Sequence, residues 1–192
     1  GFEATSDLDA LTSWRVFYPD DGDDFGATVQ HAGDLDADGY DELVVSAPRR
    51  DKILVDDGAV WVFSGQEIAR TGGATDPADA AIAEIVGNAA LNQRVGEGLA
   101  APGDVDQDGR ADLVIGAPGA PEYGEAFVIY GPAEGLYERK DLDARVTGGA
   151  ATGTGYGAAV AAPGDINGLG HPDLLLYAPE KFTWHLLFTD AL

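Results

Sequence analysis

Apolar residues occur along the chain in short runs, and clusters of Gly, Pro or Asp separate one run from the next. Typical runs are Leu43–Pro48, Gly58–Gly65 and Leu113–Pro118. Short β-branched and apolar runs that lie between turn residues are typical of buried strands, and the helical period is missing from them. The pattern therefore predicts an all-β protein rich in turns.

The same succession of features occurs three times. A glycine precedes an acidic loop, which leads into an apolar run that ends at a proline. Three sets of markers share the same spacing of 70 and then 61 residues: Gly26, Gly96 and Gly157; Asp34, Asp104 and Asp165; Pro48, Pro118 and Pro179. Three independent markers that agree on two intervals indicate a true repeat. Each unit has room for about four antiparallel strands, the size of one β-propeller blade.

We predict one repeat array over residues 1–192. Its parts are a lone outer strand at 12–18, a first blade at 25–87, a second at 95–148 and an incomplete third at 156–188. The last unit supplies only three strands. A ring of about three blades is too small to close, so its edges need partners.

Two explanations remain open for the incomplete ring. The chain is either a fragment of a longer propeller or half of a dimeric six-bladed ring, in which the amino-terminal strand of one copy completes the third blade of the other. Within the first unit, Thr71–Pro77 reads as a loop. The run Ala81–Gly87 could form a short helix, but the equivalent slot in the second unit, Ala144–Gly148, is typical of a strand.

The formal net charge is −23, with 34 acidic and 11 basic residues, and this disfavours a nucleic-acid partner. No apolar run approaches the length of a transmembrane helix, so we expect no membrane insertion. The chain has no Cys, which excludes disulfide and thiol chemistry. It also has no Met, even at its first position, which indicates a processed or excised piece.

The acidic loops suggest metal binding. In the second unit, Asp104, Asp106, Asp108 and Asp112 occupy positions 1, 3, 5 and 9 of a short loop, with Gly109 at position 6. Converging carboxylates repel one another unless a hard cation neutralises them. A ligand set of oxygens alone favours calcium over zinc or copper, and the number of carboxylates favours calcium over magnesium.

The D-x-D-x-D-G pattern of the first two loops also occurs in the EF-hand. An EF-hand needs a bidentate Glu at position 12 and flanking helices. Position 12 is instead Val45, Ile115 or Leu176, each within an apolar run. The EF-hand interpretation therefore fails, and the remaining alternative to calcium is a set of ordinary Asp-Gly turns.

Paired motifs in each unit carry a family resemblance. They are Phe25-Gly26 with Ser46-Ala47-Pro48, Val95-Gly96 with Gly116-Ala117-Pro118, and Tyr156-Gly157 with Tyr177-Ala178-Pro179. These motifs resemble the FG-GAP repeat of integrin α-subunit β-propellers, including prokaryotic integrin-like relatives. The resemblance covers nearly all of residues 12–188.

In that family the loop holds calcium through side chains at positions 1, 3, 5 and 9 and through the carbonyl at position 7. The resemblance implies two full ligand sets here: Asp34, Asp36, Asp38, Tyr40 and Glu42; and Asp104, Asp106, Asp108, Arg110 and Asp112. The third loop keeps Asp165, Asn167 and Asp173, and His171 could offer its carbonyl. Leu169 stands where position 5 needs an oxygen. We therefore expect two calcium sites and a third that is weak or empty.

Catalytic motifs are missing from the sequence. It has no G-x-S-x-G elbow, no H-E-x-x-H pair and no phosphate-binding glycine loop, and its three His are scattered. The prediction is a non-enzymatic, calcium-binding module, extracellular or at the cell surface, for adhesion or for recognition of a protein or cell-surface ligand. The alternatives are an accessory propeller of a secreted hydrolase and a purely architectural assembly module.

Overall fold

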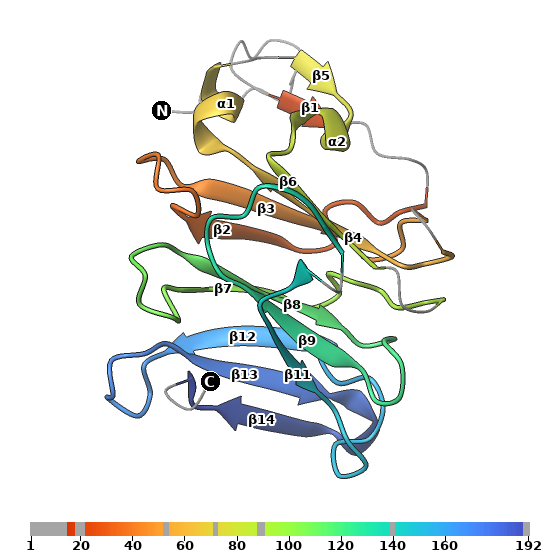
Figure 1. Cartoon of the computed structure of the whole chain (residues 1–192). Coiled ribbons are helices and arrows are strands. Elements are labelled where there is room, and N and C mark those ends of the chain that lie inside the picture. Colours follow the sequence, from red (N-terminus) through yellow and green to blue (C-terminus); the bar gives the residue numbers. More distant parts are fainter. Residues whose placement is uncertain are drawn as a thin grey trace, which may run out of the picture.

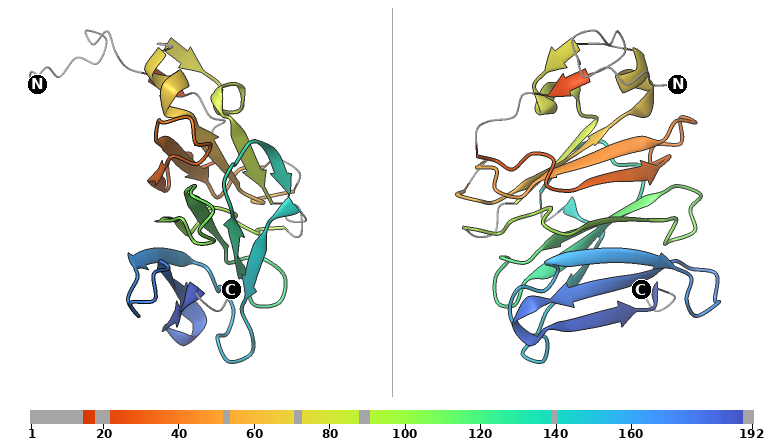
Figure 2. Two further views of the ribbon diagram at one scale, coloured as in Figure 1. Left: turned by 60° about the vertical axis from the view of Figure 1, so that its left-hand side comes forward. Right: turned by 180° about the vertical axis from the view of Figure 1, so that it is seen from behind.

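Three stacked β-sheets form the body of the protein (Figure 1). This computed structural model describes residues 15–17, 22–51, 54–70, 73–87, 91–138 and 141–189. The sheets lie face to face as successive blades of a partial β-propeller, and the turned views in Figure 2 show the layers again. The predicted all-β fold class is confirmed.

The first sheet has five strands in the order β10-β6-β4-β3-β2. Their bounds are β2 Val29–Gly33, β3 Glu42–Ala47, β4 Ala59–Phe63, β6 Ala83–Val86 and β10 Gly135–Glu138. The strand interpretation of Ala81–Gly87 is therefore confirmed, since β6 lies within this run. The four strands β2, β3, β4 and β6 pair antiparallel, whereas β10 pairs parallel to β6.

The second sheet has the order β11-β9-β8-β7 and the third β12-β13-β14, both with antiparallel neighbours only. The strands of the second sheet are β7 Leu99–Gly103, β8 Asp112–Ala117, β9 Glu125–Ile129 and β11 Ala144–Thr147. Those of the third are β12 Ala159–Gly164, β13 Asp173–Ala178 and β14 Thr183–Leu187. Because β10 lies between β9 and β11 in the chain, the second unit supplies a strand to the edge of the first.

The amino-terminal strand has a partner in its own chain. Strand β1 (Arg15–Phe17) pairs parallel with β5 (Gly73–Thr75), so the expected lone strand is paired and part of the expected loop Thr71–Pro77 is a strand. Residues 12–14 and 18 of the predicted strand lie outside the described residues. Backbone N–H and C=O groups need partners, and the edge of a short strand supplies them.

Short helices complete the described elements. They are α1 Gly65–Arg70, α2 Pro77–Ala80 and the 3₁₀-helix η3 Pro179–Lys181. Asp76 caps α2, because its side chain accepts a hydrogen bond from the N–H of Ala78 at 2.8 Å. Within the described part of the chain, no helix combines the length and the apolar character that crossing a membrane requires.

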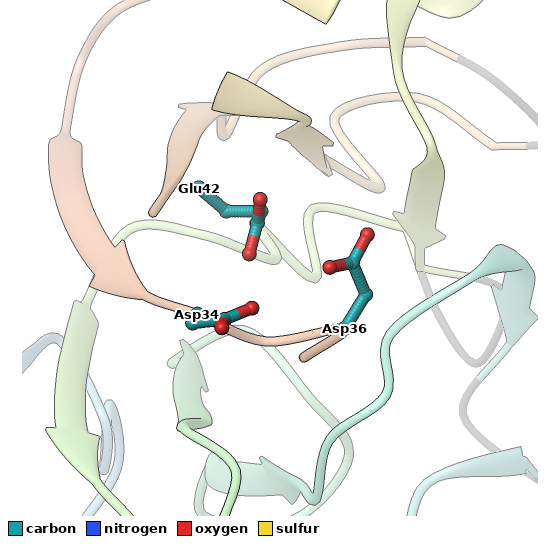
Figure 3. A group of neighbouring side chains, drawn as sticks. All are labelled: Asp34, Asp36 and Glu42. Carbon is teal, nitrogen blue, oxygen red and sulfur yellow. The ribbon is translucent and has the colours of Figure 1, made fainter. Parts of the chain in front are cut away.

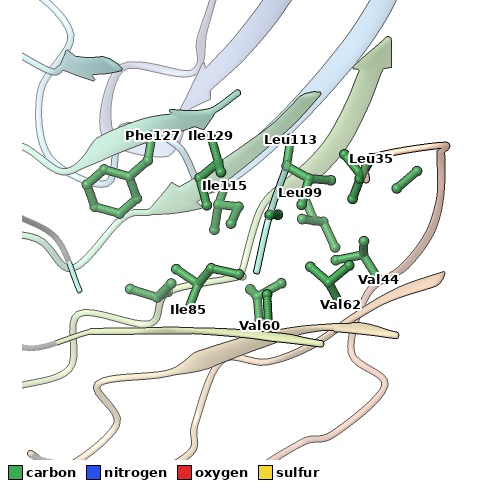
Figure 4. Packing of buried hydrophobic residues seen from close by; sticks show 14 of the residues in the cluster. Leu35, Val44, Val60, Val62, Ile85, Leu99, Leu113, Ile115, Phe127 and Ile129 are labelled. Carbon is green, nitrogen blue, oxygen red and sulfur yellow. The ribbon is translucent and has the colours of Figure 1, made fainter. Parts of the chain in front are cut away.

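The core lies between the sheets. Figure 4 shows the first interface, in which Val44, Val60 and Ile85 face Leu113 and Ile115 of the second sheet. The neighbouring residue on β8, Val114, points the other way and packs against Leu174 and Leu176 of the third sheet. Successive residues of β8 thus fill two different cores, which explains why its run is apolar at nearly every position.

Candidate metal sites

Three acidic loops lie at one side of the stack, on the left in Figure 1. They occupy residues 34–41, 104–111 and 165–172, each between the first two strands of its sheet. The strand pairing shifts register just before every loop, at Gly33, Gly103 and Gly164. These glycines have φ of 74°, 89° and 87°, a left-handed conformation that favours glycine. The repeat in the sequence is therefore also a repeat in backbone conformation.

The three loops also have the same backbone conformation at positions 4 and 6. At position 4 the φ angles are 62° for Ala37, 63° for Gln107 and 75° for Gly168. At position 6 each loop has a glycine, with φ between 90° and 94°. A left-handed Ala or Gln is disfavoured by its Cβ, so other interactions must hold these turns in place.

Hydrogen bonds from backbone N–H groups to loop side chains stabilise these turns. In every loop the position-1 carboxylate accepts from the N–H groups of positions 5 and 6 at 2.8–3.1 Å. The side chain at position 3 accepts a hydrogen bond from the backbone N–H of position 5 at 2.9–3.1 Å. The side chain at position 9 accepts one from the backbone N–H of position 2 at 2.6–2.8 Å. Asp38 and Asp108 at position 5 also accept from position 7 at 2.8 Å, which Leu169 cannot do.

The first loop brings three carboxylates together. One oxygen each of Asp34, Asp36 and Glu42 lies within 4.8 Å of the others, and Figure 3 shows the three groups around a common space. The side chain of Asp38, the expected position-5 ligand, is not part of this group. Tyr40, whose carbonyl was the expected position-7 ligand, has a side chain that is half exposed.

Glu42 supports a cation at this place. It is 1% exposed, its Oε2 accepts from the N–H of Leu35 at 2.7 Å, and its Oε1 is buried without a hydrogen-bond partner. A buried carboxylate oxygen without a partner is costly, and a bound cation would remove that cost. Burial raises the pKa of Glu42 and also that of Asp36, so without a cation these carboxylates are harder to ionise. The residues present fit a metal ion.

The second loop gathers a different trio. Asp104, Asp106 and Asp108 each place a carboxylate oxygen within 4.8 Å of the others. Asp112 at position 9 is not one of this trio, and its two oxygens accept hydrogen bonds from the N–H groups of Val105 at 2.6 Å and Gly131 at 3.0 Å. Burial raises the pKa of Asp112 to about 6. At the same loop position, the longer side chain of Glu42 places an oxygen within the first trio.

A basic side chain lies beside the second trio. The guanidinium of Arg110, which occupies position 7, is 3.3 Å from Oδ2 of Asp108. Its backbone N–H also donates to Oδ1 of the same carboxylate at 2.8 Å. Only the carbonyl of Arg110 was expected to bind a metal, and its guanidinium provides part of the positive charge that the trio needs.

The third loop lacks such a trio within the described residues. Asp165 and Asp173 remain, with Asn167 at position 3 and His171 at position 7. Asp173 is fully buried, and its Oδ1 has no hydrogen-bond partner. Leu169 is 62% exposed, so its apolar side chain turns away from the loop interior. One oxygen suited to a cation is present, but the loop supplies only two carboxylates.

Adjacent loops are linked in different ways. Between the first two loops, the N–H of Ala111 at position 8 donates to the carbonyl of Asp34 at 3.3 Å. Position 8 of the third loop is Pro172, which has no N–H to donate. Nδ1 of His171 instead lies 3.1 Å from the carbonyl oxygen of Val105, and the amide nitrogen of Gln107 lies 3.2 Å from Nε2 of His171. Pro172 is the sequence feature which indicates that the second and third loops are linked differently from the first two.

Comparisons with known proteins agree with these repeats. The family model of the FG-GAP repeat matches residues 25–63 and 96–130, the segments that contain the first two acidic loops. Integrin alpha-IIb of Homo sapiens is 32% identical over 163 residues, which is 80% of this chain and 14% of that protein. The chain is built from integrin-type FG-GAP repeats.

Other relatives of this FG-GAP chain show similar coverage. Integrin alpha-IIb of Mus musculus is 30% identical over 166 residues, 80% of this chain and 15% of that protein. Integrin alpha-PS5 of Drosophila melanogaster is 36% identical over 106 residues, 55% of this chain and 10% of that protein. The FG-GAP chain thus spans only 10–15% of the length of these integrin subunits.

Proposed function

We propose that this FG-GAP chain is a non-enzymatic, calcium-stabilised propeller module, extracellular or at the cell surface, that serves adhesion or the recognition of a protein ligand. The observation that carries the proposal is the pair of equivalent loops that each bring three carboxylates within 4.8 Å of one another. The unpartnered, buried Oε1 of Glu42 adds a second reason to expect a cation in the first loop.

Calcium is the cation that the ligand chemistry favours. The candidate ligands are oxygens only, and calcium accepts six to eight oxygens in flexible geometry, whereas magnesium demands a near-ideal octahedron. In the first site, Asp38 and the carbonyl of Tyr40 would complete the set formed by Asp34, Asp36 and Glu42. In the second site, the carbonyl of Arg110 and the side chain of Asp112 would join the three clustered aspartates. The third loop, with two carboxylates, should bind weakly or not at all.

The role of the ion is structural in this proposal. Each loop joins the first two strands of a sheet, and its carboxylates repel one another when all are ionised. An ion that binds the folded loop but not the unfolded chain stabilises the fold by ligand linkage. Calcium should therefore hold together the side of the stack where the loops meet.

Thermal unfolding with calcium and with EDTA tests this role. Two sites saturated at about 100 times their Kd would add about 5 kcal/mol, so chelation should lower the Tm by about 10–20 °C for a domain of this size. Magnesium at the same concentration is the control and should restore only a small part of the shift. An unchanged Tm in EDTA would contradict the structural role.

Recognition of a protein ligand rests on the integrin-type repeats and is tested separately. Beads coated with the chain should retain one or more members of a panel of purified extracellular matrix proteins in calcium and release them in EDTA. Retention of none, by a chain that binds calcium normally, would favour the purely architectural module over the adhesion role.

A further inference from the structure

One peptide group of the second loop faces both candidate cation sites. The carbonyl of Arg110 is the proposed position-7 ligand of the second site, and the N–H of the same peptide group belongs to Ala111. That N–H donates to the backbone carbonyl of Asp34, position 1 of the first loop, at 3.3 Å. The two ends of one rigid, planar group therefore lie at the ligand set of one site and at the loop of the other.

A second peptide group continues this path into the first site. The carbonyl of Asp34 and the N–H of Leu35 belong to one peptide group, and this N–H donates to Oε2 of Glu42 at 2.7 Å. Glu42 is buried and belongs to the first carboxylate trio. The two peptide groups, Arg110–Ala111 and Asp34–Leu35, thus form a hydrogen-bonded peptide relay from a proposed ligand of the second site to one of the first.

The surroundings of the peptide relay are tightly packed. A Cβ atom at Gly131 would lie 2.7 Å from the carbonyl oxygen of Leu35 and 2.8 Å from that of Ala111, so the backbone of Gly131 fills the space between the two loops. Its N–H donates to Asp112, position 9 of the second loop, at 3.0 Å. Close-packed interiors transmit displacement. Neither loop can therefore shift here without disturbing the other.

The third loop is not joined to the second by such a relay. Its position 8 is Pro172, which has no N–H to donate. Its contact with the second loop runs instead through the ring of His171, which lies 3.1 Å from the carbonyl oxygen of Val105. Within the described residues, the peptide relay thus joins the two loops that each gather three carboxylates.

Occupancy of the second site should act on the first through the peptide relay. The hydrogen bond from Ala111 to Asp34 is long at 3.3 Å, so it has room to shorten. A cation at the Arg110 carbonyl polarises that peptide group and makes its N–H a stronger donor, and hydrogen bonds in a chain strengthen one another. The same contact orders the first loop before its own site fills, which lowers the entropic cost of the second binding event.

We propose that the peptide relay couples the two cation sites, so that each bound ion raises the affinity of the other site. The coupling is reciprocal, as linkage of binding free energies requires. The proposal rests on the proposed calcium binding and adds a connection between the two sites. The two ions also repel one another, but stacked sheets lie about 10 Å apart, and at about 0.15 M salt the screening length is about 8 Å.

Calcium titration of the metal-free full chain at this salt concentration measures the coupling. Asp36→Ala should leave the second tight site and Asp106→Ala the first, because each removes the position-3 ligand of one loop. The product of the two association constants of the wild type, divided by the product of the two single-site constants, gives the coupling ratio. We expect a ratio of about 5 or more, the lower end of typical couplings.

Ala111→Pro breaks the peptide relay, because proline removes the donor and forces the Asp34 carbonyl away. Position 8 accommodates a proline in the third loop, where Pro172 occupies it. With both single-site variants repeated in this background, the coupling ratio should fall to unity. Asp41→Pro is the matched control, since Asp41 holds position 8 of the first loop and its N–H donates no backbone hydrogen bond among the described residues. Its ratio should stay as in the wild type.

Amide proton NMR gives a second measurement that does not need a proline variant. In Asp36→Ala, calcium should fill only the second site, yet the amide proton of Leu35 in the first loop should shift downfield as the relay shortens. Ile166 is the matched amide, because it holds position 2 of the third loop and donates to Asp173 at 2.8 Å. The amide proton of Ile166 should not shift.

The outcomes separate the coupling from the calcium binding on which it rests. Two ions bound by the wild type with a coupling ratio of one would overturn the coupling and leave the proposed calcium sites intact. A chain that binds no calcium would overturn both. A ratio that survives Ala111→Pro, or a Leu35 amide proton that does not move, would overturn the peptide relay as the path.

Discussion

The second and third acidic loops have nearly the same backbone conformation and different side chains at the candidate ligand positions. Position 6 has a φ of 92° in Gly109 and 94° in Gly170, and the position-1 aspartate accepts the same two N–H hydrogen bonds in both loops. Yet three carboxylates cluster in the second loop, whereas the described residues of the third loop contain no such cluster. The loop conformation therefore depends on hydrogen bonds that both loops keep, while a carboxylate trio also needs acidic residues at positions where the third loop has Asn167 and Leu169.

The two loops also differ in what attaches them to their neighbours. The second loop donates a backbone hydrogen bond from Ala111 to the first loop, whereas the third contacts the second through the His171 ring. The contact from His171 to the carbonyl of Val105 needs no ion. A loop without a carboxylate at position 5 can therefore stay in place beside a loop that has one.

The largest expected effect comes from removing a ligand at position 3. Asp106→Ala should lower the Tm in calcium by about 6–16 °C, since a site saturated at 100–1,000 times Kd contributes about 3–4 kcal/mol. In EDTA the loss should be small, because only the hydrogen bond from the Asp108 N–H at 3.1 Å is removed. Differential scanning calorimetry in both buffers measures this.

Asn167→Ala is the matched control, since Asn167 holds position 3 of the third loop and accepts from the Leu169 N–H at 2.9 Å. Its effect should be the same in calcium and in EDTA. If Asn167→Ala lowered the Tm only in calcium, the third loop would bind the ion, and the proposed difference between the two loops would be wrong.

A somewhat smaller effect should follow from restoring the missing oxygen. Leu169→Asp supplies the position-5 carboxylate, and Leu169 is exposed enough to be replaced without a core defect. The variant should gain about 1–3 kcal/mol in calcium through a new site, at modest saturation. Ile166→Asp adds the same charge at position 2, where Ile166 is 55% exposed, and should gain nothing. Equal gains in both variants would mean that added charge, not ligand position, is responsible.

The smallest expected effect is a change with pH in the Tm difference between calcium and EDTA, which reports on the second loop. Burial raises the pKa of Asp112 to about 6, from 3.8, so the folded metal-free protein binds a proton more readily than the unfolded chain between these values. Stability from this proton is present at low pH and is lost as the pH rises through about 6. Calcium favours the ionised carboxylates instead, so the Tm difference between calcium and EDTA should narrow from about pH 7 to about pH 5.

Asp112→Asn removes this titration and should weaken the narrowing. The comparison is between the two pH series, so a constant loss of stability in the variant does not affect it. A variant whose Tm difference narrows as much as that of the wild type would show that Asp112 does not control the pH dependence.

Much of the fold could be predicted from local pattern. The apolar runs and the repeat of Gly, Asp and Pro predict the four antiparallel strands of the first two sheets, because each run fills a core on one or both sides. Strand β10 could not be predicted in the same way. Gly135–Glu138 is short and has no buried residue. Its parallel pairing with β6 brings together segments about fifty residues apart, which no periodicity in the sequence indicates. The pairing of β1 with β5 is non-local for the same reason.

The sites were predictable in position and less so in detail. The spacing of the acids located the loops, but which carboxylates converge depends on side-chain length and on backbone N–H groups from elsewhere. Glu42 places a carboxylate oxygen in the first cluster, whereas Asp112, which accepts from the N–H of Gly131 outside its loop, is not part of the second. Hydrogen bonds from distant segments to a loop carboxylate form only when those segments pack together, so the sequence alone does not reveal them.

Calorimetric titration of the metal-free chain with calcium tests the central claim most directly, because it counts the sites. The account predicts two ions bound tightly per chain, with the third loop weak or silent, and one ion bound tightly by Asp106→Ala. Three equal sites, or no heat of binding at all, would contradict it.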